Sequence, residues 1–181
     1  MTTLETDKAN GVATITVCID TNSINVIQRD PHINQLEEWH RSGLIEIRRT
    51  SALTEELSLN FGSLGEARRQ KAAGYKEGRD NRAFTMRRST LRGGDTLRGP
   101  KASQWVPLIS KILFPGSPFH ELSSHLQQDV AHLAIHKLHG WDFFVTYDRR
   151  HILRHQERLT REVGIAVLSP KDAVARLGGA M

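Results

Sequence analysis

Short apolar runs recur along this chain and are separated by segments with a different periodicity. Residues 12–19 alternate β-branched side chains with their neighbours and become almost wholly apolar near Ile19, which is typical of a central strand. Three further apolar runs of strand length lie at 44–49, 141–146 and 164–168. We expect each of these four segments to form a β-strand.

The segments between these runs place apolar residues at helical spacing. The clearest pattern spans residues 119–139, and Pro170 stands at the start of a terminal helix, where proline is tolerated. Further helices are predicted at 32–41, 103–114 and 149–161, and another opens at Ser51 or Thr54 with Glu55 and Glu56 in its first turn. Strands that alternate with helices predict an α/β fold, with a central, mostly parallel, twisted sheet of about four to five strands flanked by helices.

Residues 60–102 break this pattern, because they are rich in Gly and Arg and poor in aliphatic residues. Such a segment can bury little apolar area, so we expect a mobile or partly helical surface insertion. It also concentrates the positive charge: residues 66–101 hold 11 Lys and Arg against 4 acidic residues, whereas the remainder holds 14 against 16. A local basic patch suits nucleic acid; a solvated insertion and contact with an acidic protein are the alternatives.

The length of 181 residues and the hydrophobic fraction of 38% favour a single domain, 1–181, that carries the insertion at 60–102. Cys18 is the only cysteine, which excludes an intrachain disulfide, and its apolar neighbours predict a buried side chain. No run approaches the roughly 20 apolar residues of a membrane span, and the polar, acidic N-terminus is unlike a signal peptide. We therefore expect a cytoplasmic protein.

Acidic residues stand where predicted strands end or predicted helices begin. Asp20 occurs in VCIDTN, Glu55 and Glu56 in TSALTEEL, Asp129 in QQDVAHLAIH and Asp148 in FFVTYDRR. The ends of parallel strands converge at one edge of a sheet, so these carboxylates can meet in one cleft. Clustered carboxylates repel one another unless a cation binds them, and Mg²⁺ or Mn²⁺ prefers oxygen ligands. The pattern predicts a metal-dependent nuclease.

These positions also have structural interpretations. Asp20 can form an Asx-turn or a helix cap, and Asp148 or Thr146 can cap the helix that follows, which contributes about 1 kcal/mol. Capping and metal binding need not exclude one another. Arg149 and Arg150 can hold a phosphate or can be solvated surface side chains.

Four histidines and an aspartate share one face of the helix predicted at 119–139. His125, Asp129, His132, His136 and His139 recur at spacings of 4, 3, 4 and 3, within an arc of about 80°. An adjacent arc of leucine, valine and alanine residues is expected to face the core. The stripe has three interpretations: a plain polar face, a proton or phosphate role for one histidine, or transition-metal binding.

The order of these motifs resembles that of the PIN-domain nucleases, in particular the toxin-like single-domain ribonucleases. VCIDTN is similar to the family's first strand with its leading aspartate, and TSALTEEL to the segment that bears its glutamate. DVAHLAIHKLHGWDFFVTYDRRHI is the closest match, and GIAVLSPKDAVARL resembles the last strand and helix. The resemblance covers roughly residues 12–59 and 119–178, and the basic insertion has no clear counterpart in it.

This resemblance implies an endoribonuclease that uses Mg²⁺ or Mn²⁺ to hydrolyse phosphodiester bonds in single-stranded RNA. Glu56 is preferred to Glu55, because Leu57 after it resembles the family's Glu-Leu pair. The implied catalytic metal ligands are Asp20, Glu56, Asp129 and Asp148, with Asn22 and Thr146 as supporting polar groups. The basic residues expected at the nucleic acid are Arg87, Arg88, Arg92, Arg149 and Arg150.

Two partners and two other functions stay open. Many small proteins that resemble this family are toxins neutralised by an antitoxin protein, and the apolar helix at 103–114 would permit a homodimer. The chain could instead be a non-catalytic RNA-binding or regulatory interaction protein of the same fold. It could also be a DNA nuclease, because no residue that would read a 2′-hydroxyl can be identified.

Overall fold

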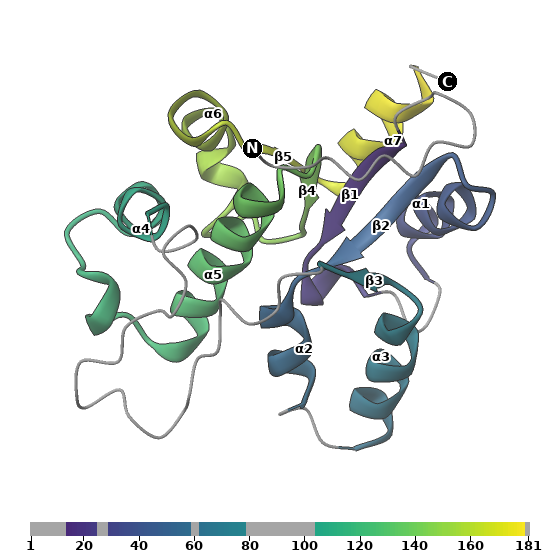
Figure 1. Cartoon of the computed structure of the whole chain (residues 1–181), viewed down its shortest axis with the longest axis horizontal. Coiled ribbons are helices and arrows are strands. Elements are labelled where there is room, and N and C mark those ends of the chain that lie inside the picture. Colours follow the sequence, from purple (N-terminus) through teal and green to yellow (C-terminus); the bar gives the residue numbers. More distant parts are fainter. Residues whose placement is uncertain (1–13, 25–28, 59–61, 79–103, 180–181) are drawn as a thin grey trace, which may run out of the picture.

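The computed structural model describes residues 14–24, 29–58, 62–78 and 104–179. Its centre is a five-stranded, all-parallel sheet in which the strand order is β3-β2-β1-β4-β5 (Figure 1). The strands are β1 Ile15–Ile19, β2 Ile45–Arg49, β3 Lys76–Glu77, β4 Phe143–Val145 and β5 Ala166–Leu168. The predicted α/β fold with a parallel sheet flanked by helices is confirmed.

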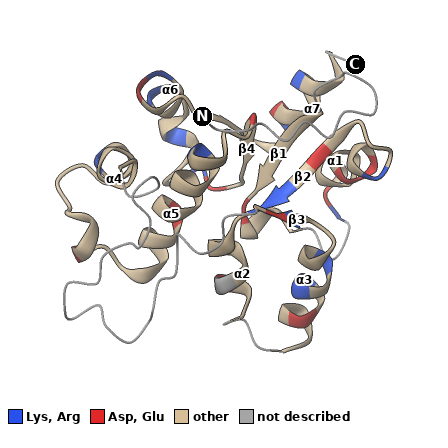
Figure 2. Ribbon diagram, in the orientation of Figure 1, with Lys and Arg blue, Asp and Glu red and all other residues tan. Residues whose placement is uncertain are grey.

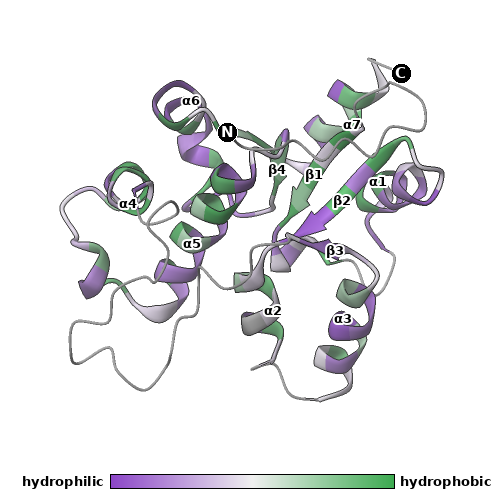
Figure 3. Ribbon diagram, in the orientation of Figure 1, coloured by the Kyte–Doolittle hydropathy of each residue, from purple (hydrophilic) through white to green (hydrophobic). Residues whose placement is uncertain are grey.

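The central position of β1 agrees with its sequence. Cys18 pairs with Arg48 of β2 on one side and with Phe144 of β4 on the other. Cys18 and Phe144 are fully buried, as expected for neighbouring strands of a parallel sheet covered on both faces. The hydrophobic character of β1 can be followed in Figure 3. The chain winds from β1 toward β3 in one direction and returns to add β4 and β5 in the other, so the strand order reverses beside β1.

Alternate residues of the central strands face two different helical layers, because successive side chains of a strand point to opposite sides. Cys18 packs with α4 (Val106–Leu113) and α5 (Ser124–His139) in one hydrophobic cluster. Val17 and Val145 pack with α1 (Pro31–Arg41) and α7 (Pro170–Gly178) in the other. The sheet therefore lies between two helical layers (Figure 1).

The other helical segments are short. Two helices expected from the sequence are each broken into shorter segments. The helix predicted at 119–139 is interrupted because Leu122 and Ser123 have extended backbone conformations. The helix predicted at 149–161 begins later and is split into 3₁₀, α and π turns. The segments are η1 Thr21–Ser23, α2 Ser51–Ser58, α3 Ser63–Ala73, η3 Phe119–Glu121, η4 Leu153–His155, α6 Gln156–Arg158 and η5 Leu159–Val163. No helix in the described part of the chain has both the length and the apolar character needed to cross a membrane.

The start of α2 corrects one expectation. The helix begins at Ser51, and the Leu53 N–H donates to Thr50 Oγ1 at 3.1 Å. Glu55 and Glu56 therefore occupy the second turn of α2, whereas the sequence predicted them in the first.

The first part of the basic insertion is built into the domain. Residues 62–78 contain helix α3, as the expectation of partial helix allowed, and strand β3, which the sequence did not reveal. Tyr75 is 6% exposed, and its hydroxyl donates to Glu37 Oε1 at 2.9 Å. On α3 one acidic residue, Glu66, is followed by the basic residues Arg68, Arg69 and Lys71 (Figure 2). Residues 79–103, which include most of the predicted basic patch, lie outside the described residues.

Candidate metal centre

The acids predicted to form a site come from the ends of two adjacent strands and from two nearby helices. Asp20 directly follows β1, and Asp148 closely follows β4. Asp20 N–H donates to Val145 O at 3.1 Å, which holds the two strand ends side by side. The strand order reverses at this boundary, and α/β proteins bind ligands in the crevice at such a reversal.

The Asp20 carboxylate is nearly enclosed, with 5% exposure of the residue. Its Oδ1 accepts a 2.7 Å hydrogen bond from Thr21 N–H, and its Oδ2 accepts one of 2.8 Å from the Thr146 hydroxyl. Burial raises the pKa of Asp20, and nearby Glu56 acts in the same direction, whereas His132 and the two hydrogen bonds oppose the rise. The capping interpretation of Asp20 is confirmed, because Asp20 is the N-cap of η1.

The two oxygens of Asp148 have different partners. Oδ1 accepts 2.8 Å hydrogen bonds from the backbone N–H groups of Arg150 and His151, which closes the turn after β4. Oδ2 lies 3.2 Å from Nδ1 of His151. The Asp148 N–H donates to Thr146 Oγ1 at 3.0 Å, so Thr146 contacts both strand-end aspartates. Asp148 thus closes a turn with one oxygen and presents the other to a histidine.

Asp129 reaches the same place from α5. The residue is 7% exposed, and its Oδ2 has no hydrogen-bond partner among the described residues. Nδ1 of His151 lies 3.8 Å from this Oδ2. Burial, together with the carboxylates of Asp20 and Asp148, raises the pKa of Asp129 to about 8. An uncompensated buried carboxylate is costly, so this position favours a proton or a cation beside it.

Glu56 lies beside these acids and has its own partners. Its Oε2 accepts a 2.6 Å hydrogen bond from the Thr21 hydroxyl and lies 3.6 Å from Nε2 of His132. Burial opposes the charged form of Glu56, but His132 and Thr21 prevail and lower its pKa. The ionised form of Glu56 is therefore favoured, and Glu56 is paired with a histidine.

His132 is enclosed, with 1% exposure, on the face of α5 that also carries Asp129. Its Nδ1 lies 2.7 Å from Thr50 Oγ1, the hydroxyl that also caps α2. Burial favours the neutral imidazole, but the nearby carboxylates of Glu56 and Asp20 outweigh burial and raise the pKa of His132. His132 thereby joins α5 to the start of α2, and the acids beside it favour its protonated form.

The histidine stripe is not a solvated polar face. His125 is exposed, but His132 and His136 are both 1% exposed. His136 lies edge-on to Phe144, with ring centroids 5.6 Å apart, and burial lowers its pKa to about 3. His139 stacks on Trp141 at 4.6 Å. The helical wheel failed here because α5 is packed on more than one side, by α4 and by α2.

The remaining predicted residues divide into three groups. Asn22 is exposed on η1 and is not brought into the group of acids. Arg149 and Arg150 are exposed in the turn beside Asp148, where their side chains face solvent. The side chain of Glu55, like Arg87, Arg88 and Arg92 as whole residues, lies outside the described part of the structure.

Sequence reasoning missed three polar side chains of this site: Thr21, Thr50 and His151. For His151 a signal existed, because an aspartate that closes a turn brings the residue three positions later back over its own carboxylate. Asp148 and His151 have this spacing. Thr50 directly follows β2 and Thr21 comes two residues after β1, so both stand where the predicted acids were sought.

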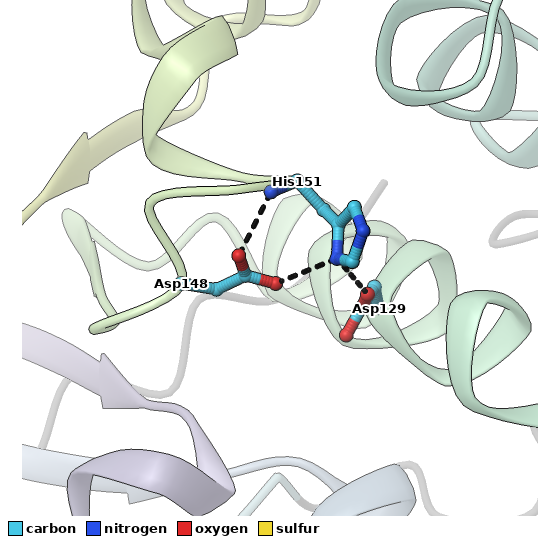
Figure 4. Close-up of side chains that lie close together, drawn as sticks. All are labelled: Asp129, Asp148 and His151. Atoms are coloured by element: carbon cyan, nitrogen blue, oxygen red, sulfur yellow. Dashed lines mark hydrogen bonds and ion pairs between the residues drawn. The ribbon is translucent and has the colours of Figure 1, made fainter.

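The donor set fits a divalent cation. Among the described residues, Asp129, Asp148 and His151 each offer a donor atom, and these atoms all lie within 4.8 Å of one another (Figure 4). Asp20 and Glu56 border this group, but their oxygens accept hydrogen bonds from threonine hydroxyls. Two of the four predicted ligands therefore converge tightly, and the other two flank them.

Comparison with protein-family models, with curated proteins and with solved structures finds no match for this chain. The resemblance to PIN-domain nucleases therefore rests on the order of the sequence motifs.

Proposed function

We propose that this protein is a divalent-metal-dependent endoribonuclease that hydrolyses phosphodiester bonds in single-stranded RNA. The observation that carries the proposal is the carboxylate of Asp129. It is buried, Oδ2 has no hydrogen-bond partner among the described residues, and the atom lies close to donor atoms of Asp148 and His151. A fold that brings such a group beside further carboxylates gains stability when a cation balances their charge.

The arrangement supports hydrolytic chemistry at a phosphate. A bound Mg²⁺ or Mn²⁺ supplies a water of lowered pKa and charge stabilisation at the phosphate oxygens. Asp129 and Asp148 present oxygens that would hold such an ion, and Thr146 keeps the ends of β1 and β4 together by contacting Asp20 and Asp148. The residues of this chain thus provide positioning and charge, which are the main requirements of phosphoryl transfer to water.

A nucleic-acid substrate agrees with the charge around the acids. Arg149 and Arg150 are exposed beside Asp148, where they can contact phosphates that flank the cleaved bond. Basic side chains of this kind give affinity that weakens as the salt concentration rises. The choice of RNA follows the motif resemblance, so the test below includes DNA.

The proposal is tested by incubating labelled single-stranded RNA, and DNA of the same sequence, with Mn²⁺ and four proteins. These are the wild type, Asp20→Asn, Asp148→Asn and the control Glu157→Gln, which changes an exposed acid on α6. Asp148→Asn retains a carbonyl oxygen for the two backbone N–H groups, so the turn is preserved. Outer-shell changes alone cost about 10- to 100-fold, so we expect the two site variants to lose more than about 100-fold in rate.

Three outcomes would contradict parts of the proposal. Equal RNA cleavage by the wild type and Asp148→Asn would reject the assignment of the site. Cleavage of DNA in preference to RNA would correct the substrate. Binding of RNA that persists in chelator, with no cleavage under any metal, would identify a non-catalytic RNA-binding protein.

A further inference from the structure

The candidate metal centre contains a nitrogen donor that the acidic motifs did not predict. His151 Nδ1 lies 3.2 Å from Asp148 Oδ2 and 3.8 Å from Asp129 Oδ2 (Figure 4). Within the described residues, one donor atom from each of these three side chains lies within 4.8 Å of the other two. The imidazole therefore stands where a third ligand to the same ion would be.

Each of the three side chains is held by contacts of its own. Asp148 is fixed through Oδ1, which accepts two backbone N–H groups, so Oδ2 is left for another partner. The ring of His151 packs at a tilt against Phe114, with centroids 5.7 Å apart and an interplanar angle of 57°. Asp129 belongs to a buried stretch of α5 and is 7% exposed. The group is thus organised before any ion enters, which reduces the cost of binding.

The separations match those of donors that share a cation. Metal–donor distances of about 2.0–2.2 Å imply that two ligands lie about 3.0 Å apart at a right angle and about 3.5 Å apart at a tetrahedral angle. The observed 3.2 Å and 3.8 Å are close to these values. The buried Oδ2 of Asp129, without a hydrogen-bond partner, is an independent sign that the centre is short of one positive group.

We infer that His151 Nδ1 is a metal ligand together with Asp129 and Asp148, and that the centre therefore prefers a first-row transition ion to Mg²⁺. This inference rests on the cation site of the proposed function and concerns which ion the site selects. Mg²⁺ favours oxygen donors and keeps its waters, whereas imidazole suits Zn, Cu, Fe and Ni, and Mn²⁺ is the weakest binder of the first-row series. A mixed set of two carboxylates and one imidazole thus shifts selectivity away from Mg²⁺.

The first measurement uses the wild-type protein and Mn²⁺, with no RNA present. Electron spin-echo envelope modulation of bound Mn²⁺ should show coupling to an imidazole nitrogen, and labelling the histidines with ¹⁵N should change its frequencies. A Mn²⁺ complex without nitrogen coupling would overturn the inference and leave His151 as an internal counter-charge for the two aspartates. This measurement does not depend on any variant being able to fold.

The second measurement compares Mn²⁺ and Mg²⁺ affinities by calorimetry in His151→Phe, which removes the donor and keeps an aromatic ring against Phe114. The control His120→Phe changes an exposed histidine on η3. We expect His151→Phe to weaken Mn²⁺ binding by about 10- to 100-fold and Mg²⁺ binding by less than about 3-fold. Equal weakening of both ions, or of neither, would contradict the inference.

The inference and the proposed function can fail separately. Nitrogen-coupled Mn²⁺ in a protein that cleaves no RNA would keep this inference and reject the nuclease. Full RNA cleavage by His151→Phe with an unchanged Mn²⁺ affinity would keep the nuclease and reject the inference. Absence of binding by either ion would reject both.

Discussion

The Thr146 hydroxyl donates a 2.8 Å hydrogen bond to Oδ2 of Asp20, across 126 residues of sequence. Both side chains are buried, and Thr146 is fully enclosed. The same hydroxyl oxygen accepts the N–H of Asp148 at 3.0 Å. One threonine therefore determines how the end of β1 and the end of β4 present their aspartates.

Replacement of Thr146 by valine should destabilise the fold, because it keeps the shape and removes both hydrogen bonds. A buried polar group left without its partner costs about 1–3 kcal/mol, so we expect the free energy of unfolding to fall by that amount. Thr146→Ser retains the hydroxyl and should stay within about 1 kcal/mol of the wild type. Urea denaturation followed by circular dichroism measures the free energy of unfolding of both variants. If Thr146→Val is as stable as the wild type, the hydroxyl makes no net contribution to stability.

Asp129→Asn should melt at or above the temperature of the wild type in chelator. The substitution removes a carboxyl group whose ionisation is opposed by burial and by Asp20 and Asp148. Mn²⁺ at about 100 times its Kd should stabilise the wild type by about 2.7 kcal/mol. That gain corresponds to a rise in Tm of roughly 5–10 °C for a chain of this size.

The same metal titration should leave the Tm of Asp129→Asn almost unchanged. Glu157→Gln, an exposed acid on α6, serves as the control and should respond as the wild type does. A lower Tm for Asp129→Asn in chelator, with no response of the wild type to Mn²⁺, would assign Asp129 a structural role.

Burial lowers the pKa of His136 to about 3, with Lys137 and His139 acting in the same direction and Asp142 against it. In the unfolded chain this imidazole titrates near its ordinary value of about 6.5, so between these values the unfolded state binds the extra proton. Stability is therefore lost as the pH falls below about 6.5. From pH 7 to pH 5 the loss should be about 2 kcal/mol.

His136→Leu, which cannot take up a proton, should remove this part of the pH dependence. The free energy of unfolding is measured by urea denaturation at several pH values, with exposed His120→Gln as the control. As the pH falls, the free energy of unfolding of the wild type should decrease relative to that of His136→Leu. Parallel pH profiles would show that His136 has the same pKa in the folded and in the unfolded protein.

The sequence predicted the strands and helices whose apolar patterns are long enough to read. The four runs predicted at 12–19, 44–49, 141–146 and 164–168 contain β1, β2, β4 and β5. Strand β3 has two residues, Lys76 and Glu77, and two residues cannot show an alternation. It exists because it pairs with the end of β2, which is a tertiary effect.

The candidate site was predicted only in part, because some of its residues are placed by tertiary packing and not by a local sequence pattern. Asp20 and Asp148 were found because strand ends are visible in the sequence and converge by topology. The roles of His132 and His151 depend on which side of a helix or turn faces the acids. The helical wheel placed His132 on a polar face, but α2 covers that side of α5 and encloses the ring.

The order of the strands also divides the site between two lengths of polypeptide. Asp20 and Glu56 precede residue 79, Asp129 and Asp148 follow residue 103, and the β1–β4 pairing brings them to one edge. Hydrophobic packing is shared in the same way, since Cys18 packs with α5 and Val145 with α1. A chain cut between residues 79 and 103 would have two of these four acids on each fragment. Recovery of metal affinity on mixing the two fragments would therefore report that they reassemble.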